Sequence, residues 1–323
     1  MPKRKKVLIC GATGFIGRNI AETLAKDDRY EVTGVHFSSP PFAHPAIRFV
    51  RADLTNREQV DALLNGVDIV IQAAATTSGA KDIVTRPHIH IADNAMMNSL
   101  ILRAAFENKV GHLVFYSCSV MYPSSETPLK ETDFTNGGDI HVRYFGAGWT
   151  KVYVEKMCEF YSRIGGTKFT IIRHSNIYGP HDKYDLERSH VFGATVTKVM
   201  TAADGRVVVW GSGEEARDLM YVSDLNHFVA AALDRQTAPF ALYNAGAGRA
   251  VSVKDLVAKI VAASGRTLRI EHDLSQPTIK TTLSLDASKA KRELDWEPRV
   301  SLDEGIRLTL DWYRRTVSKT DSP

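Results

Sequence analysis

The sequence has few cysteines and lacks any long hydrophobic segment. Its 323 residues include three cysteines, Cys10, Cys118 and Cys158, which are odd in number and far apart. This spacing argues against a disulfide framework or a zinc knuckle, so we expect no metal site. No apolar run approaches the roughly 20 residues that cross a bilayer, and no signal-peptide pattern precedes the first apolar segment. We therefore expect a cytoplasmic protein with no membrane partner.

A large charge of either sign is also missing. The 41 Lys and Arg residues nearly balance the 37 Asp and Glu residues, which leaves a formal net charge of +4. Part of this excess lies in a basic run at residues 3–6, which we interpret as a solvated N-terminal arm. We expect no nucleic-acid partner. The 44% share of hydrophobic residues is that of an ordinary globular protein.

A glycine-rich turn follows the first apolar run. Residues 6–10 are typical of a buried parallel strand, and a helical pattern begins at about residue 15. Glycines at such a junction allow a tight turn and let a pyrophosphate approach the backbone beside the positive helix N-terminus. We predict a dinucleotide site formed by Gly11, Thr13, Gly14, Phe15, Ile16 and Gly17. A plain strand–helix turn is the alternative interpretation.

The next two predicted strands end in further candidates. The strand at 31–35 leads to His36, Ser38 and Ser39, with no acidic residue to bind a ribose 2′-hydroxyl and repel a 2′-phosphate. This absence favours NADP over NAD, unless these are only turn residues. Asp53, followed by Leu54, comes after the strand at 47–50, where its carboxylate is placed to reach an adenine edge. Alternatively, Asp53 caps the helix that begins near residue 57.

Small residues follow the strand predicted at 67–71, where Ala73, Ala74 and Ala75 leave room for a ligand beside the backbone. A helix at about 92–108 and a strand at 112–116 continue the alternation of strands and helices. This order indicates an α/β fold, a doubly wound parallel sheet with right-handed crossovers. A smaller, mixed α/β lobe is predicted in the C-terminal part.

The glycine turn, the Asp53–Leu54 pair, the alanine loop and the later Lys151 together resemble the extended short-chain dehydrogenase/reductase family, which acts on nucleotide sugars. The resemblance implies a Rossmann domain, which binds the dinucleotide, and a second lobe, which binds the sugar nucleotide. The Rossmann domain takes residues 1–175 and part of 220–245, and the lobe takes 176–220 and 246–323.

The resemblance also implies a homodimer. The helices at the dimer interface would be those near residues 92–108 and 150–164, with Val152, Val154 and Met157 packed between the two subunits.

Family members carry a Ser or Thr that binds the reacting oxygen, and a Tyr four residues before a Lys. Here Cys118 occupies the Ser/Thr position, and Ser119 is the nearest hydroxyl, which we expect to take that role. Lys151 matches the lysine that binds the nicotinamide ribose and lowers the tyrosine pKa. The tyrosine position, however, holds Ala147, which has no titratable group.

Three explanations for Ala147 remain open at this point. A tyrosine was replaced there to trap a substrate complex, or a natural variant uses Tyr144, a bound water or His190 instead, or the chain is a non-catalytic, cofactor-binding regulator. General acid–base catalysis typically contributes about 10²–10⁴-fold, so the missing phenol should slow the reaction by a similar factor. Ligand binding need not suffer equally.

The second half of the sequence continues the resemblance, in particular to the GDP-L-fucose synthase branch of the family. The string at 173–180 and the run at 179–191 match that branch, which implies an acid–base role for one histidine and ligand contacts for several residues. The predicted contacts are His174 to the cofactor, and Asn176, His190, Lys198, Trp210 and Arg217 to the sugar nucleotide.

Structural alternatives exist for four of these residues. For His190 the alternative is a purely structural role, which is common for a lone histidine. Lys198 is otherwise on a solvated helix face, Trp210 in the core, and Arg217 in a surface ion pair with Glu214 or Asp218. The cysteine that this branch uses for double epimerisation is replaced by a valine at position 120. We therefore expect an NADP-dependent reductase or epimerase/reductase of a nucleotide-linked, most simply GDP-linked, 4-keto-6-deoxy sugar. An NAD-dependent nucleotide-sugar 4-epimerase is the alternative.

Overall fold

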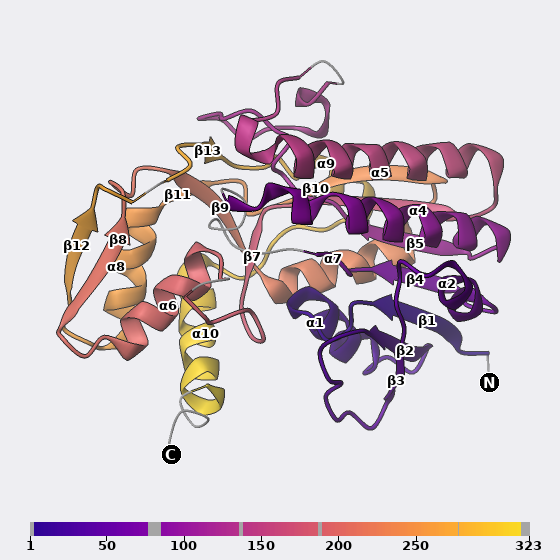
Figure 1. The fold of residues 1–323 in the computed structure, drawn as a ribbon, viewed down its shortest axis with the longest axis horizontal. Helices are drawn as coiled ribbons and strands as arrows, with labels where there is room; N and C mark the ends of the chain where they lie inside the picture. Colours follow the sequence, from indigo (N-terminus) through magenta and orange to yellow (C-terminus); the bar gives the residue numbers. More distant parts are fainter. Residues whose placement is uncertain (1–2, 77–84, 136–137, 187–188, 277, 318–323) are drawn as a thin grey trace.

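A seven-stranded parallel sheet forms the larger part of the molecule (Figure 1). The structure is a computed structural model that describes residues 3–76, 85–135, 138–186, 189–276 and 278–317. The strand order is β10-β6-β5-β4-β1-β2-β3, and each neighbouring pair is parallel. The strands are β1 (Lys5–Cys10), β2 (Tyr30–His36), β3 (Ile47–Arg51), β4 (Ile69–Gln72), β5 (His112–Tyr116), β6 (Lys168–His174) and β10 (Phe240–Ala245).

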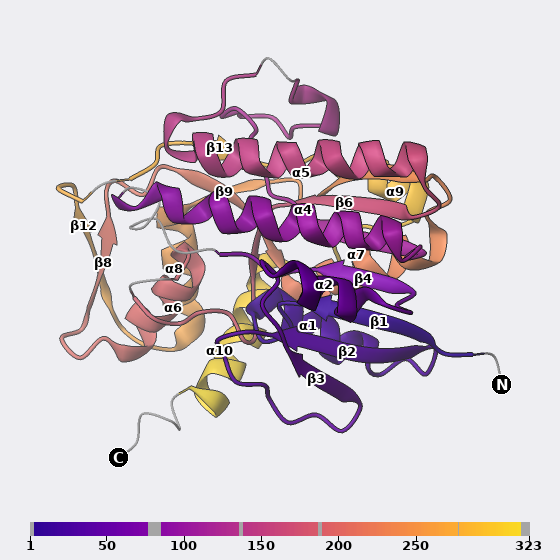
Figure 2. The same cartoon turned by 45° about the vertical axis from the view of Figure 1, so that its right-hand side comes forward.

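Helices cover both faces of this sheet. On one face lie α1 (Phe15–Leu24), α7 (Val222–Arg235) and α9 (Ser288–Leu294); on the other lie α2 (Arg57–Leu64), α4 (Ala92–Glu107) and α5 (Phe145–Ile164). Both ribbon views show α4 and α5 side by side (Figures 1 and 2). The arrangement confirms the predicted doubly wound, Rossmann-like α/β fold.

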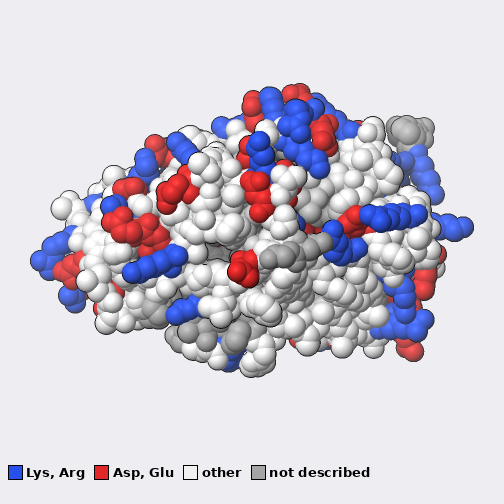
Figure 3. Space-filling view, turned by 90° about the horizontal axis from the view of Figure 1, so that it is seen from above, with Lys and Arg blue, Asp and Glu red and all other residues white. Residues whose placement is uncertain are grey.

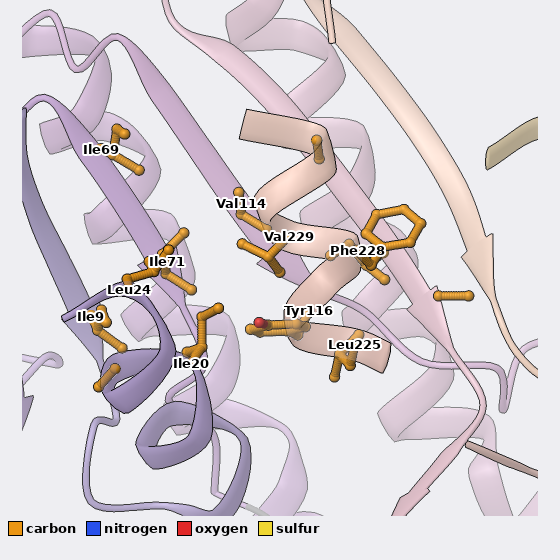
Figure 4. Close-up of a cluster of buried hydrophobic side chains, with 14 of the residues drawn as sticks. Ile9, Ile20, Leu24, Ile69, Ile71, Val114, Tyr116, Leu225, Phe228 and Val229 are labelled. Atoms are coloured by element: carbon orange, nitrogen blue, oxygen red, sulfur yellow. The ribbon is translucent and has the colours of Figure 1, made fainter. Parts of the chain in front are cut away.

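The buried cluster between the sheet and helices α1 and α7 explains why the strands read as continuous apolar runs. Ile9, Ile71 and Val114 point from neighbouring strands toward Ile20 of α1 and Val229 of α7 (Figure 4). A strand that is covered on both faces has no solvated side, so its residues do not alternate between apolar and polar. This core places the carboxyl ends of all seven strands at one edge.

A smaller lobe is built around β9 (Ala216–Tyr221). It pairs with β7 (Asn176–Tyr178), β11 (Ala250–Ser252) and β13 (Thr282–Leu283), while β8 (Arg206–Trp210) pairs with β12 (Arg269–Asp273). The helices of this lobe are α6 (Val191–Thr201), α8 (Val253–Ser264) and α10 (Leu302–Thr316). Short 3-10 turns are η1 (Pro87–His90), η2 (Glu131–Asp133) and η3 (Val142–Tyr144). The chain leaves the large sheet after β6 and returns to it in β10. The predicted domain boundaries stay a prediction.

The two regions are joined by main-chain hydrogen bonds between residues 124–129 and residues 282–286. The Ser125 amide donates to the Thr282 carbonyl (2.8 Å), and the Leu129 amide donates to the Ser284 carbonyl (2.9 Å). The Asp286 amide donates back to the Leu129 carbonyl (2.8 Å). A segment that follows β5 of the large sheet is thereby tied to the segment that contains β13 of the small lobe.

Two residues predicted for a dimer seam lie elsewhere. Val152 and Val154 are 5% and 1% exposed because they pack inside the monomer, so they cannot meet a second copy. The helical pattern alone did not distinguish the inner face of α5 from its outer face. Phe145, Tyr153, Phe160 and Ile164 are exposed apolar residues of this helix, and Met157 is partly buried against the core.

The surface carries mixed charge. In the view of Figure 3, Lys and Arg side chains are interspersed with Asp and Glu side chains over the face that is visible. Among the residues that the structure describes, no helix is long and apolar enough to cross a membrane.

Candidate active site

The glycine turn between β1 and α1 forms a cradle for an anionic group. Gly11 has a left-handed backbone (φ 76°), and a Cβ added there would lie 2.7 Å from the Cα of Ala74. Gly17 contacts the Gly11 carbonyl, which leaves no room for a side chain. Gly14 caps α1 without a side-chain hydrogen bond, and no acidic residue lies in the first helical turn. The Ala12 and Gly14 amides already donate to the Val35 and Gly11 carbonyls. The amides of the first turn of α1 have no intrahelical partner and can donate to a pyrophosphate.

The other predicted residues of the cradle surround this helix start. Thr13 lies in the turn itself, and Phe15 and Ile16 are the first two residues of α1, all partly exposed. Ala73 and Ala74 follow β4 and are also partly exposed, while Ala75 is exposed. The carboxyl ends of β1 and β4 are neighbours in the sheet, so these segments border one space.

The tip of β2 is free of acidic residues and lies beside an arginine. His36 ends this strand, and its Nδ1 lies 3.0 Å from the Ser39 carbonyl oxygen; Ser38 and Ser39 are exposed. Arg51, at the end of β3, pairs in register with His36, and its Nε donates to the Phe37 carbonyl (3.3 Å). Sequence reasoning did not single out Arg51, because it becomes a neighbour of the β2 tip only through the strand pairing.

Asp53 does not cap the helix that follows it. Asn56 is the N-cap of α2, and its side chain accepts a hydrogen bond from the Gln59 amide (3.1 Å), so the capping interpretation of Asp53 was wrong. The Asp53 carboxylate instead accepts from the hydroxyl (2.6 Å) and the amide (2.9 Å) of Thr55. These bonds lower the pKa of Asp53. Leu54 beside it is buried.

Lys151 projects from α5 toward the carboxyl end of β5. Its Nζ donates to the Tyr116 carbonyl (2.7 Å) and lies 4.7 Å from the centre of the Phe115 ring. Burial lowers the pKa of Lys151, although the neighbouring Cys118 and Glu155 oppose this effect. The side chain is partly exposed yet densely surrounded by protein, as a residue in a cleft is.

Ala147 lies one turn before Lys151, between two glycines that fit against neighbouring side chains. A Cβ on Gly146 would lie 2.5 Å from Cδ1 of Ile91, and a Cβ on Gly148 would lie 3.0 Å from Ile140. These close contacts hold the start of α5 in place. Ala147 itself is partly exposed.

Of the two candidates for the reacting-oxygen position, Cys118 is the one that neighbours the charged groups of this site. It is partly exposed, and burial raises the pKa of its thiol while the positive charge of Lys151 opposes this. Ser119 is 7% exposed, and its carbonyl accepts from the Tyr122 amide (3.1 Å). The role of Ser119 as the functional hydroxyl therefore stays a prediction.

A buried ion pair that sequence reasoning missed lies behind α5. Arg173 Nη2 and Glu155 Oε2 are 2.6 Å apart, and the two side chains are 5% and 4% exposed. The Ser117 hydroxyl also donates to Glu155 (2.6 Å), and Arg173 donates to the Tyr122 hydroxyl (3.0 Å). Burial opposes the charge of Arg173, but Glu155 outweighs it, so the pKa of Arg173 is raised. A hollow of about 230 Å³ adjoins this pair.

Two histidines border the cleft close to Lys151. The pKa of His174 is lowered to about 4, mainly by burial; its hydrogen bond with the Ser175 carbonyl opposes this shift, and the charges of Lys151 and His190 add to it. His190 caps the start of α6, and solvent reaches its side chain although protein surrounds it. This dense surrounding lowers the pKa of His190, with a smaller effect from Lys183. His174 is thus close enough to both Lys151 and His190 for its charge to interact with theirs.

Arg217, on β9, is bound only by main-chain carbonyls among the described residues. Its guanidinium donates to Ala216 (2.9 Å), Ile279 (2.9 Å) and Thr281. The predicted alternative, a surface ion pair, was wrong. Glu214 pairs with Lys254 (2.8 Å), and Asp218 is buried and accepts main-chain amides.

Lys198 and Trp210 interact with each other. The Lys198 ammonium lies 5.3 Å from the centre of the Trp210 ring and donates to the Val208 carbonyl (2.9 Å), so this lysine does not extend along a solvated helix face. Trp210 is 43% exposed, so it is not a core residue. Asn176, at the start of β7, donates to the Asp218 carbonyl at 3.4 Å.

A second hollow, of about 620 Å³, lies beside β1, β2, β3 and α2 and contains none of the predicted site residues. Within the described residues, no cluster of His, Cys, Asp and Glu has the arrangement of a metal site. The chemistry-bearing groups gather instead at the carboxyl edge of the large sheet, which faces the small lobe.

Comparisons with known proteins agree with this geometry. Residues 7–246 match the model of the NAD dependent epimerase/dehydratase family. The chain is 30% identical over 322 residues to a GDP-L-fucose synthase of Azorhizobium caulinodans, covering 97% of each protein. It is 29% identical over 326 residues to a dTDP-4-dehydro-6-deoxy-D-allose reductase of a Streptomyces species, covering 96% of each.

Solved structures show the same architecture. A UDP-glucose 4-epimerase of Thermotoga maritima, crystallised with UDP-glucose, superposes with a TM-score of 0.85 at 26% identity. The superposition covers 97% of this chain and 99% of the epimerase. Given the family match over most of the sequence, this fold and these relatives, the chain belongs to the NAD dependent epimerase/dehydratase family.

Proposed function

We propose that the protein is an NADP-dependent reductase or epimerase/reductase of a nucleotide-linked 4-keto-6-deoxy sugar, with a GDP-linked sugar as the first choice. The position of His174 at the end of β6, close to both Lys151 and His190, is the observation that carries this proposal. The full-length similarity to a GDP-L-fucose synthase and to a deoxysugar reductase supports the substrate class.

The residues present fit a dinucleotide cofactor. The Gly11 cradle and the uncapped start of α1 suit its pyrophosphate, and the Asp53 carboxylate suits its adenine. The tip of β2, with Arg51 beside it, suits a 2′-phosphate. Lys151 is placed to bind the nicotinamide ribose. When bound, the cofactor would supply a hydride to the substrate.

The other side of the cleft suits the sugar nucleotide. The partly buried guanidinium of Arg217 can form charge-assisted hydrogen bonds to the diphosphate. We propose Lys198, Trp210 and Asn176 as further contacts to the sugar nucleotide. His190 is predominantly neutral at neutral pH because its pKa is lowered, so it is suited to accept a proton from a carbon beside the keto group.

The assay is the loss of NADPH absorbance with GDP-linked and dTDP-linked 4-keto-6-deoxy sugars, with NADH in parallel. A reductase consumes NADPH in proportion to the sugar converted, and Ala147→Tyr should raise its turnover by at least about tenfold. Unchanged turnover in this variant would contradict the assignment of position 147 as the place where the catalytic tyrosine is missing. No NADPH consumption with any 4-keto sugar would refute the reductase.

The similarity to the Thermotoga maritima UDP-glucose 4-epimerase supports a second candidate, an NAD-dependent nucleotide-sugar 4-epimerase. An epimerase returns the hydride to its substrate and consumes no cofactor overall. Interconversion of two sugar nucleotides without net loss of NADPH would therefore favour this candidate.

The cofactor assignment can be tested at the glycine turn. Gly11 and Gly66 both have left-handed backbones, but only Gly11 has neighbours in the way of a Cβ. The backbone strain costs either alanine variant about 1–2 kcal/mol, and the clash at Gly11 adds about 1–3 kcal/mol. We expect Gly11→Ala to lose NADPH binding, measured by cofactor fluorescence, whereas Gly66→Ala binds normally. Equal cofactor affinity in the two variants would contradict the placement.

We also propose a homodimer through the outer faces of α4 and α5. Met96, Tyr153 and Phe160 are 51%, 48% and 55% exposed there, which is more apolar surface than solvent favours. Light scattering should give twice the mass of the chain, and Phe160→Glu should reduce it. A monomeric parent protein would contradict the proposal.

A further inference from the structure

The start of α5 carries a tyrosine that the reaction described above does not use. Tyr144 is the N-cap of this helix, Ala147 lies in its first turn, and Lys151 lies one turn later. Residues three or four apart share a face of a helix, so these three residues follow one another along the same face. A phenol at position 144 therefore lies next to the place where the family's tyrosine is missing.

The surroundings of Tyr144 connect it to the cleft. The residue is partly buried and packs with Cys118 and Trp149 against the cluster that contains Met121 and Val152. Its phenol is close enough to the Cys118 thiol and to the Arg217 guanidinium for their charges to interact. Cys118 interacts in the same way with Lys151. Tyr144 thus lies between groups of the large sheet and of the small lobe.

We propose that Tyr144 is the proton donor to the keto oxygen, in place of the tyrosine absent at position 147. This inference rests on the proposed reductase function. As the hydride of the reduced nicotinamide forms a C–H bond at the keto carbon, the C=O π bond breaks, and its oxygen takes the proton of the Tyr144 hydroxyl. The resulting phenolate regains a proton from solvent, so that the ketone, NADPH and one proton become the alcohol and NADP.

The charges around Tyr144 suit this role. Burial raises the pKa of Tyr144, Arg217 and Arg143 oppose this effect, and Cys118 adds to it. The centre of the His141 ring lies 5.8 Å from that of Tyr144. The phenol therefore holds its proton at neutral pH, and the guanidinium of Arg217 stabilises the phenolate that forms. His190 is less suited to donate, because its lowered pKa leaves it unprotonated.

The test is Tyr144→Phe, assayed for NADPH oxidation with the 4-keto sugar nucleotide that the parent protein reduces. We expect kcat to fall by about 10²-fold or more while KM changes little, because the ring remains and only the proton is lost. Tyr153→Phe is the matched control. Tyr153 lies on the same helix but is 48% exposed, and its hydroxyl lies 3.4 Å from the Ser99 hydroxyl. This control should keep its kcat.

The double variant Ala147→Tyr/Tyr144→Phe separates proton donation from folding. A phenol at position 147 should take over, so the double variant should regain at least about tenfold in kcat over Tyr144→Phe. A kcat of Tyr144→Phe within twofold of the parent would overturn the inference, and so would a double variant as inactive as the single one. These results leave the reductase intact, whereas a parent protein that oxidises no NADPH refutes the function itself.

Discussion

A buried arginine behind α5 and a partly exposed arginine on β9 are satisfied in opposite ways. Arg173 is paired with Glu155 at 2.6 Å, and the pKa of its guanidinium is raised. Arg217 donates to three main-chain carbonyls, and burial lowers the pKa of its guanidinium. Carbonyls orient a guanidinium without neutralising it. The first arginine is therefore neutralised within the protein, while the second carries a charge that no ion pair among the described residues neutralises, as its proposed contact to a diphosphate requires.

Lys151 follows the pattern of Arg217. Its ammonium donates to the Tyr116 carbonyl, and among the residues described no carboxylate forms an ion pair with it. A buried cation that lacks a carboxylate partner carries a desolvation cost that a bound ligand can offset. The presence or absence of a carboxylate partner thus distinguishes the structural cations from the proposed binding cations at this edge of the sheet.

The largest effect should come from breaking the neutralised pair. Glu155→Ala leaves the Arg173 guanidinium buried and uncompensated, which should lower the free energy of unfolding by about 3–5 kcal/mol in urea denaturation. Glu159→Ala is the control on the same helix. Its ion pairs with Lys156 and Arg163 are at the surface, so its loss should cost about 0–1 kcal/mol. Similar losses in both variants would erase the distinction between the two arginines.

Arg217→Gln should affect binding more than stability. Hydrogen bonds to charged groups contribute about 1.5–3 kcal/mol, so the Kd for GDP measured by calorimetry should rise between about tenfold and a hundredfold. Arg206→Gln, at an exposed arginine paired with Asp204, serves as the control and should bind GDP normally. An unchanged Kd for GDP in Arg217→Gln would show that Arg217 does not contribute to nucleotide binding.

The smallest effect on stability is expected at Lys151. Lys151→Met removes a desolvated ammonium and keeps most of the apolar stem, so the free energy of unfolding should change by less than about 1 kcal/mol, or rise. The same variant should bind NADPH weakly. A loss of stability as large as that of Glu155→Ala would mean that Lys151, too, is a framework residue.

Features that depend on local backbone geometry could be predicted from the sequence. The glycine turn was recognisable because Gly11 and Gly17 each occupy a position where a side chain would meet main-chain atoms. The strands of the large sheet were recognisable because both faces are covered, which makes them uniformly apolar. The doubly wound fold followed from these two signals.

Features that depend on contacts between distant segments could not be predicted. Glu155 and Arg173 meet because α5 packs against β6, and neither residue differs in sequence from an exposed charge. The Arg217 guanidinium is held by carbonyls of residues 279 and 281, which come near it only because β13 pairs with β9. Val152 and Val154 were predicted to lie at the dimer interface. A helical pattern in the sequence does not show which face of the helix packs against the sheet of its own chain.

The hydrogen bonds between residues 124–129 and 282–286 limit how far the two lobes can move apart. They join the small lobe to the large one through main-chain atoms. Such bonds cannot adapt to a movement of the lobes by a change of side-chain conformation. A hinge that opened the cleft widely would have to break several of them together. For the proposed nucleotide-sugar substrate, we therefore expect selection by fit to a site that exists before binding, with little movement of the two lobes.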